Sequence, residues 1–213
     1  MSRHPCFARC YAALSSRLLD AGARGHRKEL LAGLRGRVIE VGAGNGLNFA
    51  FYPSSVSEVV AVEPEPYLRS LAEQAARDAP CDVTVVDGLA EGLPCGDASF
   101  DAGVASLVLC SVPDQRTALR ELHRVLREDA ELRFYEHLQA ETAGLRAFQR
   151  VVDVVHPLLA GGCHTGRQTV AAIESAGFEF ERVRRFRFPG RLPAPESPHA
   201  LGVARRHPDA PPP

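Results

Sequence analysis

The sequence contains no tryptophan, only one methionine and no long apolar segment. No apolar run approaches the roughly 20 residues that a membrane-spanning helix requires, so we expect no stable insertion into a membrane. Arginines interrupt residues 1–22, which also lack the apolar core and the small-residue cleavage site of a signal peptide. These absences favour a cytoplasmic location.

Excess charge and paired cysteines are missing as well. The formal net charge is -1, and no dense basic stripe with interleaved aromatic residues occurs, so no nucleic-acid partner is expected. The six cysteines include no CxxC pair, and in a reducing compartment they are expected to be free thiols. Cys6 and Cys10 have no neighbouring group of ligands, so no metal site is predicted.

Short apolar segments alternate with helical patterns from residue 37 onward. Hydrophobic residues make up 45% of the 213 residues, enough for a single domain with a substantial core. The alternation predicts an α/β fold, in which helices cover both faces of a mostly parallel sheet. Strands are expected at 37–42, 58–64, 82–88, 100–109 and 131–137. Helices are expected at 46–52, 66–79, 114–126 and 166–176.

The two ends of the chain depart from this alternation. Residues 1–36 are expected to form an N-terminal helical cap, and 37–206 the main domain. Near the end of that domain, 178–188 and 199–206 predict an antiparallel hairpin at the sheet edge, which brings the sheet to seven strands. The proline-rich tail at 207–213 is expected to be disordered.

Three glycines follow the first strand at alternate positions, in the stretch VIEVGAGNGLNFAFYP. Glycine in such a turn lets the backbone approach a ligand closely. A dinucleotide fingerprint, GxGxxG, would place its third glycine at Leu47 rather than at Gly46, which argues against a pyrophosphate groove. Glu63 ends the second strand, about 20 residues further on, where a carboxylate can accept hydrogen bonds from ribose hydroxyls. The alternative for Glu63 is an exposed carboxylate at a strand end.

Several stretches then resemble a known family. EVGAGNG, VAVEP, DGLAEGLPCGDASFD and LHRVLRE are similar, in this order, to the motifs of class I S-adenosylmethionine-dependent methyltransferases. GLNFAFYP, SLVLCSVPDQ, FYEH and GGCHTGR resemble the methyltransferase-like subgroup that includes the alkyl thiol methyltransferases. The resemblance implies a Rossmann-like class I methyltransferase fold with S-adenosyl-L-methionine as cofactor. Relatives often read LRPGG where this chain has Leu126–Ala130, so another turn geometry is expected there.

The resemblance also implies a cofactor site built from several segments. Glu40 and the backbone of 42–46 would cradle the amino-acid end of the cofactor, and Glu63 would hold the ribose. Leu89–Glu91 would flank the adenine, and the residues after the fourth strand would line the methionine arm. The implied cofactor-binding residues are Glu40, Gly42, Ala43, Gly44, Asn45, Gly46, Asn48, Glu63, Pro64, Leu89, Ala90, Glu91, Ser106 and Leu107.

Methyl transfer also requires an acceptor that can lose its proton. A thiol, with an ordinary pKa of about 8.5, needs only the modest help that a histidine can give. His137 follows the fifth strand and His164 lies in GGCHTGR, and both are candidate catalytic bases. The alternatives are a strand-end histidine bonded to a loop carbonyl and a helix cap, respectively. Cys163 is expected to be a small buried side chain rather than a reactive thiol.

Residues 138–166 form a long insertion with apolar side chains at helical spacing, such as Phe148, Val151, Val155 and Leu158. They are expected to pack on the core, to form a lid over an acceptor pocket, or both. We therefore expect a methyltransferase acting on a small apolar acceptor, with a thiol as one candidate and the oligomeric state left open. The alternatives are a nicotinamide-dependent oxidoreductase and a non-catalytic protein that binds S-adenosylmethionine.

Overall fold

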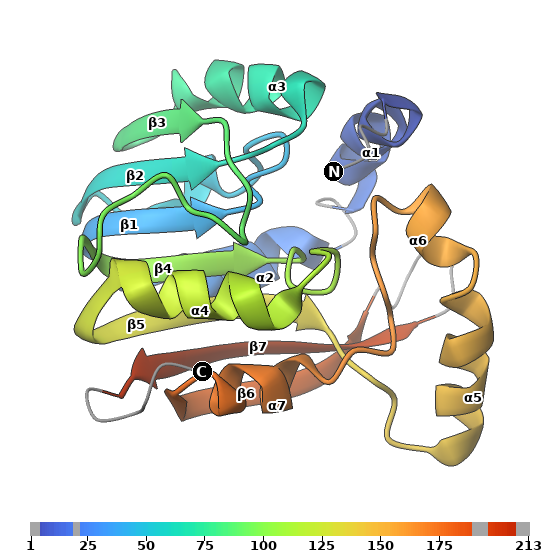
Figure 1. Ribbon diagram of the computed structural model, residues 1–213. Coiled ribbons are helices and arrows are strands. Elements are labelled where there is room, and N and C mark those ends of the chain that lie inside the picture. The colour runs from blue at the N-terminus through green and yellow to red at the C-terminus, as the bar shows by residue number, and fades with distance from the viewer. Residues whose placement is uncertain (1–4, 19–21, 189–195, 208–213) are drawn as a thin grey trace.

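The computed structural model describes residues 5–18, 22–188 and 196–207. Its strands are β1 (Gly36–Val41), β2 (Val56–Val62), β3 (Asp82–Val86), β4 (Phe100–Ser106), β5 (Leu126–His137), β6 (Phe178–Phe188) and β7 (Ser197–Arg206). Its helices are α1 (Pro5–Leu18), α2 (Arg24–Leu31), α3 (Pro66–Ala76), α4 (Gln115–Val125), α5 (Ala143–Val152), α6 (His156–Leu159) and α7 (Thr169–Ser175), with a 3-10 helix, η2 (Phe49–Phe51). Figure 1 shows their arrangement.

The seven strands form one sheet in the order β3-β2-β1-β4-β5-β7-β6. The first five strands pair in parallel, whereas β7 runs antiparallel to both β5 and β6. The chain moves outward from β1 to β3 and then returns to the other side of β1 at β4. Open α/β sheets bind their ligands at such a switch, beyond the carboxyl ends of the strands. The predicted fold class is confirmed, and within the predicted hairpin β6 forms the sheet edge.

Buried side chains form a core on each face of the sheet. Ile39 and Val38 point to opposite faces, because side chains alternate along a strand. Leu122 of α4 and Ile173 of α7 pack on the Ile39 face, and Leu30 of α2 packs on the Val38 face. Figure 1 shows α4 and α7 in front of the sheet and α2 behind it. Both faces are therefore covered by helices, as predicted.

The predicted helix at 46–52 is wrong. The segment folds instead into successive turns that end in η2. Tyr52 has an extended backbone, with φ -63° and ψ 135°, and it precedes Pro53. A residue before proline avoids the helical region, so no longer helix can pass through this point. The glycine segment is consequently followed by a turn and not by an α-helix.

Several further boundaries differ from the sequence prediction: β4 ends at Ser106 rather than at 109, and α3 ends at Ala76 rather than at 79. α7 begins at Thr169, later than the predicted start at 166, and the backbone N–H and hydroxyl of Thr165 both donate to Asp153 instead. β5 begins at Leu126, so the expected loop at 126–130 belongs to a strand. Asp129 adopts a left-handed φ of 59° within it, and the chain thus turns there without glycine.

The chain ends can be placed only in part. α1 and α2 occupy the region expected to form the helical cap, and Figure 1 shows α1 beyond the arrowheads of β1 and β2. In the described ranges, no helix combines the length and the apolar character needed to cross a membrane. Of the predicted tail at 207–213, residues 208–213 lie outside the described residues.

Gly202 on β7 provides a test of the sheet packing. A β-carbon at Gly202 would lie 2.6 Å from the Arg182 carbonyl oxygen and would also collide with the Phe134 ring. Gly202→Ala should lower the free energy of unfolding by about 1–3 kcal/mol, the usual cost of overpacking a core. Urea denaturation followed by circular dichroism measures the loss. Gly144→Ala is the control, because nothing lies within 4 Å of its added β-carbon. Equal stability of the two variants would contradict the described packing.

Candidate active site

The glycine segment after β1 forms a tight loop at the carboxyl edge of the sheet. Gly42, Gly44 and Gly46 have left-handed φ values of 66°, 58° and 78°, which other residues rarely adopt. The Gly42 N–H donates to the Val62 carbonyl at 2.8 Å and so ties the loop to β2. A β-carbon on Gly42 would lie 2.8 Å from Cβ of Val108. The glycine loop therefore touches the loop that follows β4.

Glu63 joins the end of β2 to the glycine loop. Its carboxylate accepts the Gly44 N–H at 2.8 Å and the Glu65 N–H at 2.9 Å. The side chain is buried, so the alternative of an exposed strand-end carboxylate is wrong. Burial raises the pKa of Glu63 to about 7. Its role toward the ribose, and that of Pro64 beside it, stays a prediction.

Glu40 lies beneath the glycine loop in a buried hydrogen-bond network. Its carboxylate accepts the Asn48 side-chain amide at 2.8 Å and the Tyr52 hydroxyl at 2.7 Å. Asn48 in turn accepts a hydrogen bond from the Arg27 guanidinium at 2.6 Å, and the same nitrogen of Arg27 donates to Ser106 Oγ at 3.2 Å. Burial raises the pKa of Glu40. The network links β1, the turn after it, α2 and the end of β4.

The N-terminal helix α1 lies directly against the glycine loop. A β-carbon on Gly44 would be 3.5 Å from the Tyr11 ring of α1. Asn45 donates its side-chain amide to Ser15 Oγ at 3.1 Å. Ala43, the remaining residue of the loop, is buried. These contacts place α1 over the loop that the sequence predicts to bind the cofactor.

Arg27 is a buried candidate for the site that no sequence pattern indicates. It is only 5% exposed, and its Nε has no hydrogen-bond partner among the described residues. A buried, incompletely paired guanidinium is costly unless a ligand completes its hydrogen bonds. In the sequence, Arg27 stands near Arg24 and Lys28, both exposed, so no pattern distinguishes it.

Glu136 fixes the loop after β4. Its fully buried carboxylate accepts three successive backbone N–H groups, from Val108 and Leu109 at 2.9 Å and from Cys110 at 3.1 Å. Leu107 just before them has a left-handed φ of 57°. The chain therefore turns sharply at the end of β4, and the carboxylate holds the turn. Glu136 lies within the FYEH motif, but its role could not be predicted from sequence.

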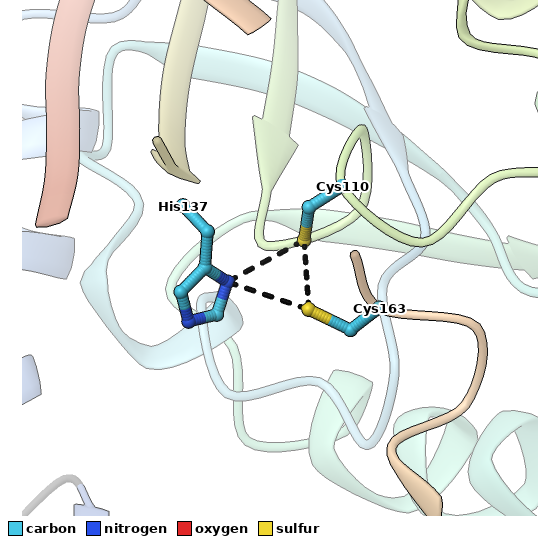
Figure 2. Close-up of side chains that lie close together, drawn as sticks. All are labelled: Cys110, His137 and Cys163. Atoms are coloured by element: carbon cyan, nitrogen blue, oxygen red, sulfur yellow. Dashed lines mark hydrogen bonds between the residues drawn. The ribbon is translucent and has the colours of Figure 1, made fainter. Parts of the chain in front are cut away.

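Three side chains converge beside this turn (Figure 2). Cys110 comes from the loop after β4, His137 from the end of β5, and Cys163 from the loop between α6 and α7. The two sulfur atoms lie 3.5 Å apart, and His137 Nδ1 lies 3.5 Å from Cys110 Sγ and 3.6 Å from Cys163 Sγ. Both cysteines are buried. His164 donates its backbone N–H to the Cys110 carbonyl at 2.8 Å.

The surroundings of the two thiols shift their pKa values in opposite directions. The hydrogen bond with Cys110 lowers the pKa of Cys163, and the neighbouring His137 and His156 lower it further. The pKa of Cys110 is raised by the same hydrogen bond and by burial. The bond with Cys163 raises the pKa of His156 to about 9, and burial lowers the pKa of His199 to about 3. Cys163 is buried, as predicted, but its environment favours the thiolate.

The segment expected to flank the adenine follows β3. Leu89 pairs with Gly92 in an isolated bridge and is 39% exposed, whereas Ala90 is buried. The Glu91 carboxylate accepts the Asp114 N–H at 3.3 Å, at the start of α4. No contact here tests the adenine role, so it stays a prediction.

The insertion at 138–166 is pinned at both ends. The Gln149 side chain accepts the Ala140 N–H at 2.7 Å and donates to the Leu138 carbonyl at 3.0 Å and the Thr165 carbonyl at 2.8 Å. Asp153 accepts the Thr165 N–H at 2.7 Å. The start and the end of the insertion are therefore tied together through α5 and the turn after it.

Four apolar side chains of this insertion are exposed and do not pack on the core. Phe148 is 56% exposed and Val151 is 71% exposed, and Val155 and Leu158 are exposed as well. The core-packing interpretation is wrong for these four side chains. A hollow of about 630 Å³ lies between α5, α7 and β6, but its lining includes Arg146 and several other charged side chains. This lining does not match an apolar acceptor.

The sheet order and the glycine loop define a Rossmann-like fold of the class I methyltransferase type. The YcgJ protein from Bacillus subtilis has the same fold, with a TM-score of 0.70 at 18% identity over 86% of this chain and 99% of that chain. An S-adenosylmethionine-dependent methyltransferase from Mesorhizobium loti gives a TM-score of 0.63 at 21% identity, over 88% of this chain and 100% of that chain.

Sequence comparison finds methyltransferases among the relatives of this chain. Residues 39–134 match the family described as methyltransferase domain. Human thiol S-methyltransferase TMT1B is 35% identical over 184 residues, which span 82% of this chain and 73% of that protein. Human thiol S-methyltransferase TMT1A is 36% identical over 71% of this chain, and the match spans 64% of its own length, just under two thirds.

The chain therefore belongs to the class I S-adenosylmethionine-dependent methyltransferases, and S-adenosylmethionine is its methyl donor. This membership decides against both alternatives, the nicotinamide-dependent oxidoreductase and the non-catalytic binding protein.

Glu136→Gln tests whether one carboxylate holds the turn after β4. A glutamine would turn its NH₂ group toward at least one of the three backbone N–H donors, so one of them would lose its partner. An unpaired buried donor costs about 1–3 kcal/mol, and urea denaturation should show this loss. The rate of Cys110 labelling by a thiol reagent, read by mass spectrometry, should rise. Glu141→Gln, at an exposed position, is the control, and an unchanged labelling rate in Glu136→Gln would contradict the assigned role.

Proposed function

We propose that this methyltransferase transfers a methyl group to the sulfur of a small apolar thiol. The observation that carries the proposal is the cluster of Cys110, His137 and Cys163. Its member Cys110 lies two residues after Val108, which contacts the glycine loop. The imidazole ring beside these sulfur atoms favours the thiolate form of a thiol bound next to it. The similarity to two human thiol S-methyltransferases supports the same class of acceptor.

The residues around the glycine loop fit S-adenosylmethionine, which supplies a methyl group already activated by a sulfonium. The unpaired Nε of Arg27 offers a cationic donor to the cofactor's carboxylate. Each Glu63 carboxylate oxygen accepts one backbone N–H and retains a lone pair for the ribose hydroxyls. Glu40 contributes indirectly, because Asn48 and Tyr52 occupy its carboxylate.

The acceptor thiol must lose its proton before its sulfur can attack the methyl group. Of the two candidate histidines, His137 has its ring within the sulfur cluster, where its Nδ1 faces Cys110 Sγ and Cys163 Sγ. His164 is supported only through its backbone hydrogen bond to Cys110. Holding a thiolate in line with the methyl group supplies much of the rate, since well-oriented reactions gain about 7–11 kcal/mol.

The same proposal assigns roles to the segments outside the central sheet. Within the predicted N-terminal cap, α1 would cover the cofactor, as the hydrogen bond from Asn45 to Ser15 supports. Residues 138–166 would form a lid on the acceptor side, with exposed apolar side chains available to a lipophilic thiol. All described cysteines are free thiols, which supports a reducing, cytoplasmic location.

A panel of acceptors tests the proposed function. Incubation with methyl-labelled S-adenosylmethionine and alkyl thiols should give labelled thioethers, whereas the alcohol and amine analogues of the same chain length should remain unlabelled. The reason is that only the thiol is readily deprotonated near neutral pH. Mass spectrometry of the products identifies the methylated atom. Transfer to an alcohol or an amine, with none to any thiol, would reject the thiol assignment.

Arg27→Met tests the cofactor part of the proposal. The substitution keeps the apolar stem and removes the guanidinium. Because a hydrogen bond to a charged group contributes about 1.5–3 kcal/mol, affinity for S-adenosylhomocysteine should fall roughly 10- to 100-fold. Isothermal titration calorimetry measures the affinity. Lys28→Met, at an exposed position on the same helix, is the matched control. Equal affinities of the two variants would remove Arg27 from the binding site.

A further inference from the structure

Three metal-ligating atoms form a nearly equilateral triangle at the carboxyl edge of the sheet (Figure 2). The Cys110 and Cys163 sulfur atoms are 3.5 Å apart, and His137 Nδ1 lies 3.5 and 3.6 Å from them. A tetrahedral zinc ion, with zinc–sulfur bonds of about 2.3 Å and zinc–nitrogen bonds of about 2.0 Å, separates two sulfur ligands by roughly 3.8 Å and a sulfur from a nitrogen by roughly 3.6 Å. The observed triangle matches these separations to within a few tenths of an ångström.

The backbone around the ligands is already fixed. Cys110 donates its N–H to Glu136 at 3.1 Å, and its carbonyl accepts the His164 N–H at 2.8 Å. The Cys163 carbonyl forms a hydrogen bond of 2.8 Å with Nδ1 of His156. These hydrogen bonds hold three segments that are far apart in the sequence in position around the triangle. Metal sites need such surrounding hydrogen bonds to orient their ligands.

We propose that Cys110, His137 and Cys163 bind one zinc ion, and that the acceptor thiolate completes its tetrahedral coordination. Thiolate and imidazole ligands favour zinc among the common divalent ions, and three protein ligands with one exchangeable position are typical of catalytic zinc. The proposal rests on the thiol methylation proposed above and deepens it. It also replaces the sequence-based expectation of no metal site, because the three ligands come from separate segments.

In this arrangement the ion activates the acceptor, and His137 is a ligand rather than a base. Coordination releases the thiol proton to solvent, because a thiol bound to zinc is deprotonated. The acceptor sulfur then donates an electron pair to the methyl carbon. The bond between that carbon and the sulfonium sulfur breaks, and its electron pair stays on the departing sulfur. The product is a neutral thioether, which carries no charge to hold it at the ion.

Metal analysis of the full chain, purified from zinc-supplemented medium with a phosphine reductant, tests the site. We expect about one zinc ion per chain, the content of a single mononuclear site. Cys110→Ser and Cys163→Ser should lose the ion. Cys95→Ser, whose half-buried thiol lies outside the triangle, should keep it. Affinity for S-adenosylhomocysteine shows that each variant is folded. Wild-type protein that binds this compound but takes up no zinc would overturn the proposal.

Cobalt(II) in place of zinc tests the fourth ligand, because its absorption spectrum reports the donor atoms. Adding a small alkyl thiol should change the spectrum and strengthen the cobalt–thiolate band, whereas the matching alcohol should not. An unchanged spectrum would overturn the acceptor role of the ion. Failure of the proposed function has a different signature: zinc is bound and the thiol changes the cobalt spectrum, yet no thiol is methylated. That result would reject thiol methylation and support the metal site.

Discussion

Buried carboxylates near the ends of three parallel strands hold the active-site loops in place. Glu40 of β1 receives Asn48 and Tyr52, Glu63 after β2 receives the glycine loop, and Glu136 of β5 receives the turn after β4. Each carboxylate satisfies donors that the loops cannot pair among themselves. These hydrogen bonds join the ends of the strands to the loops that follow them.

Burying these three carboxylates has an energetic cost. Burial raises the pKa of all three side chains, because the charged form loses its hydration. Converging backbone N–H groups offset part of the loss at Glu63 and Glu136. The three N–H groups that Glu136 accepts follow Leu107 directly, so their hydrogen bonds offset the strain of its left-handed conformation at the end of β4.

The sequence predicted most of the fold, whereas the roles of the predicted site residues stay predictions. Strands such as β1 and β2 were predictable because short segments rich in valine and isoleucine are typical of buried parallel strands. The helix expected at 46–52 is wrong, because Gly46 has a left-handed φ of 78° at its start and Pro53 keeps Tyr52 extended at its end. Arg27 and the triangle of Cys110, His137 and Cys163 could not be predicted, because only the tertiary fold brings them to one edge.

The hydrogen bonds at the base of the insertion do not involve its exposed side chains. Gln149 and Asp153 close the excursion at its base, and Cys163 lies just inside this closure. The solvent-facing side chains of α5 and α6 take no part in these bonds, so the described anchor imposes little constraint on their identity. These exposed side chains can therefore be replaced without breaking the hydrogen bonds that hold the two ends of the insertion together.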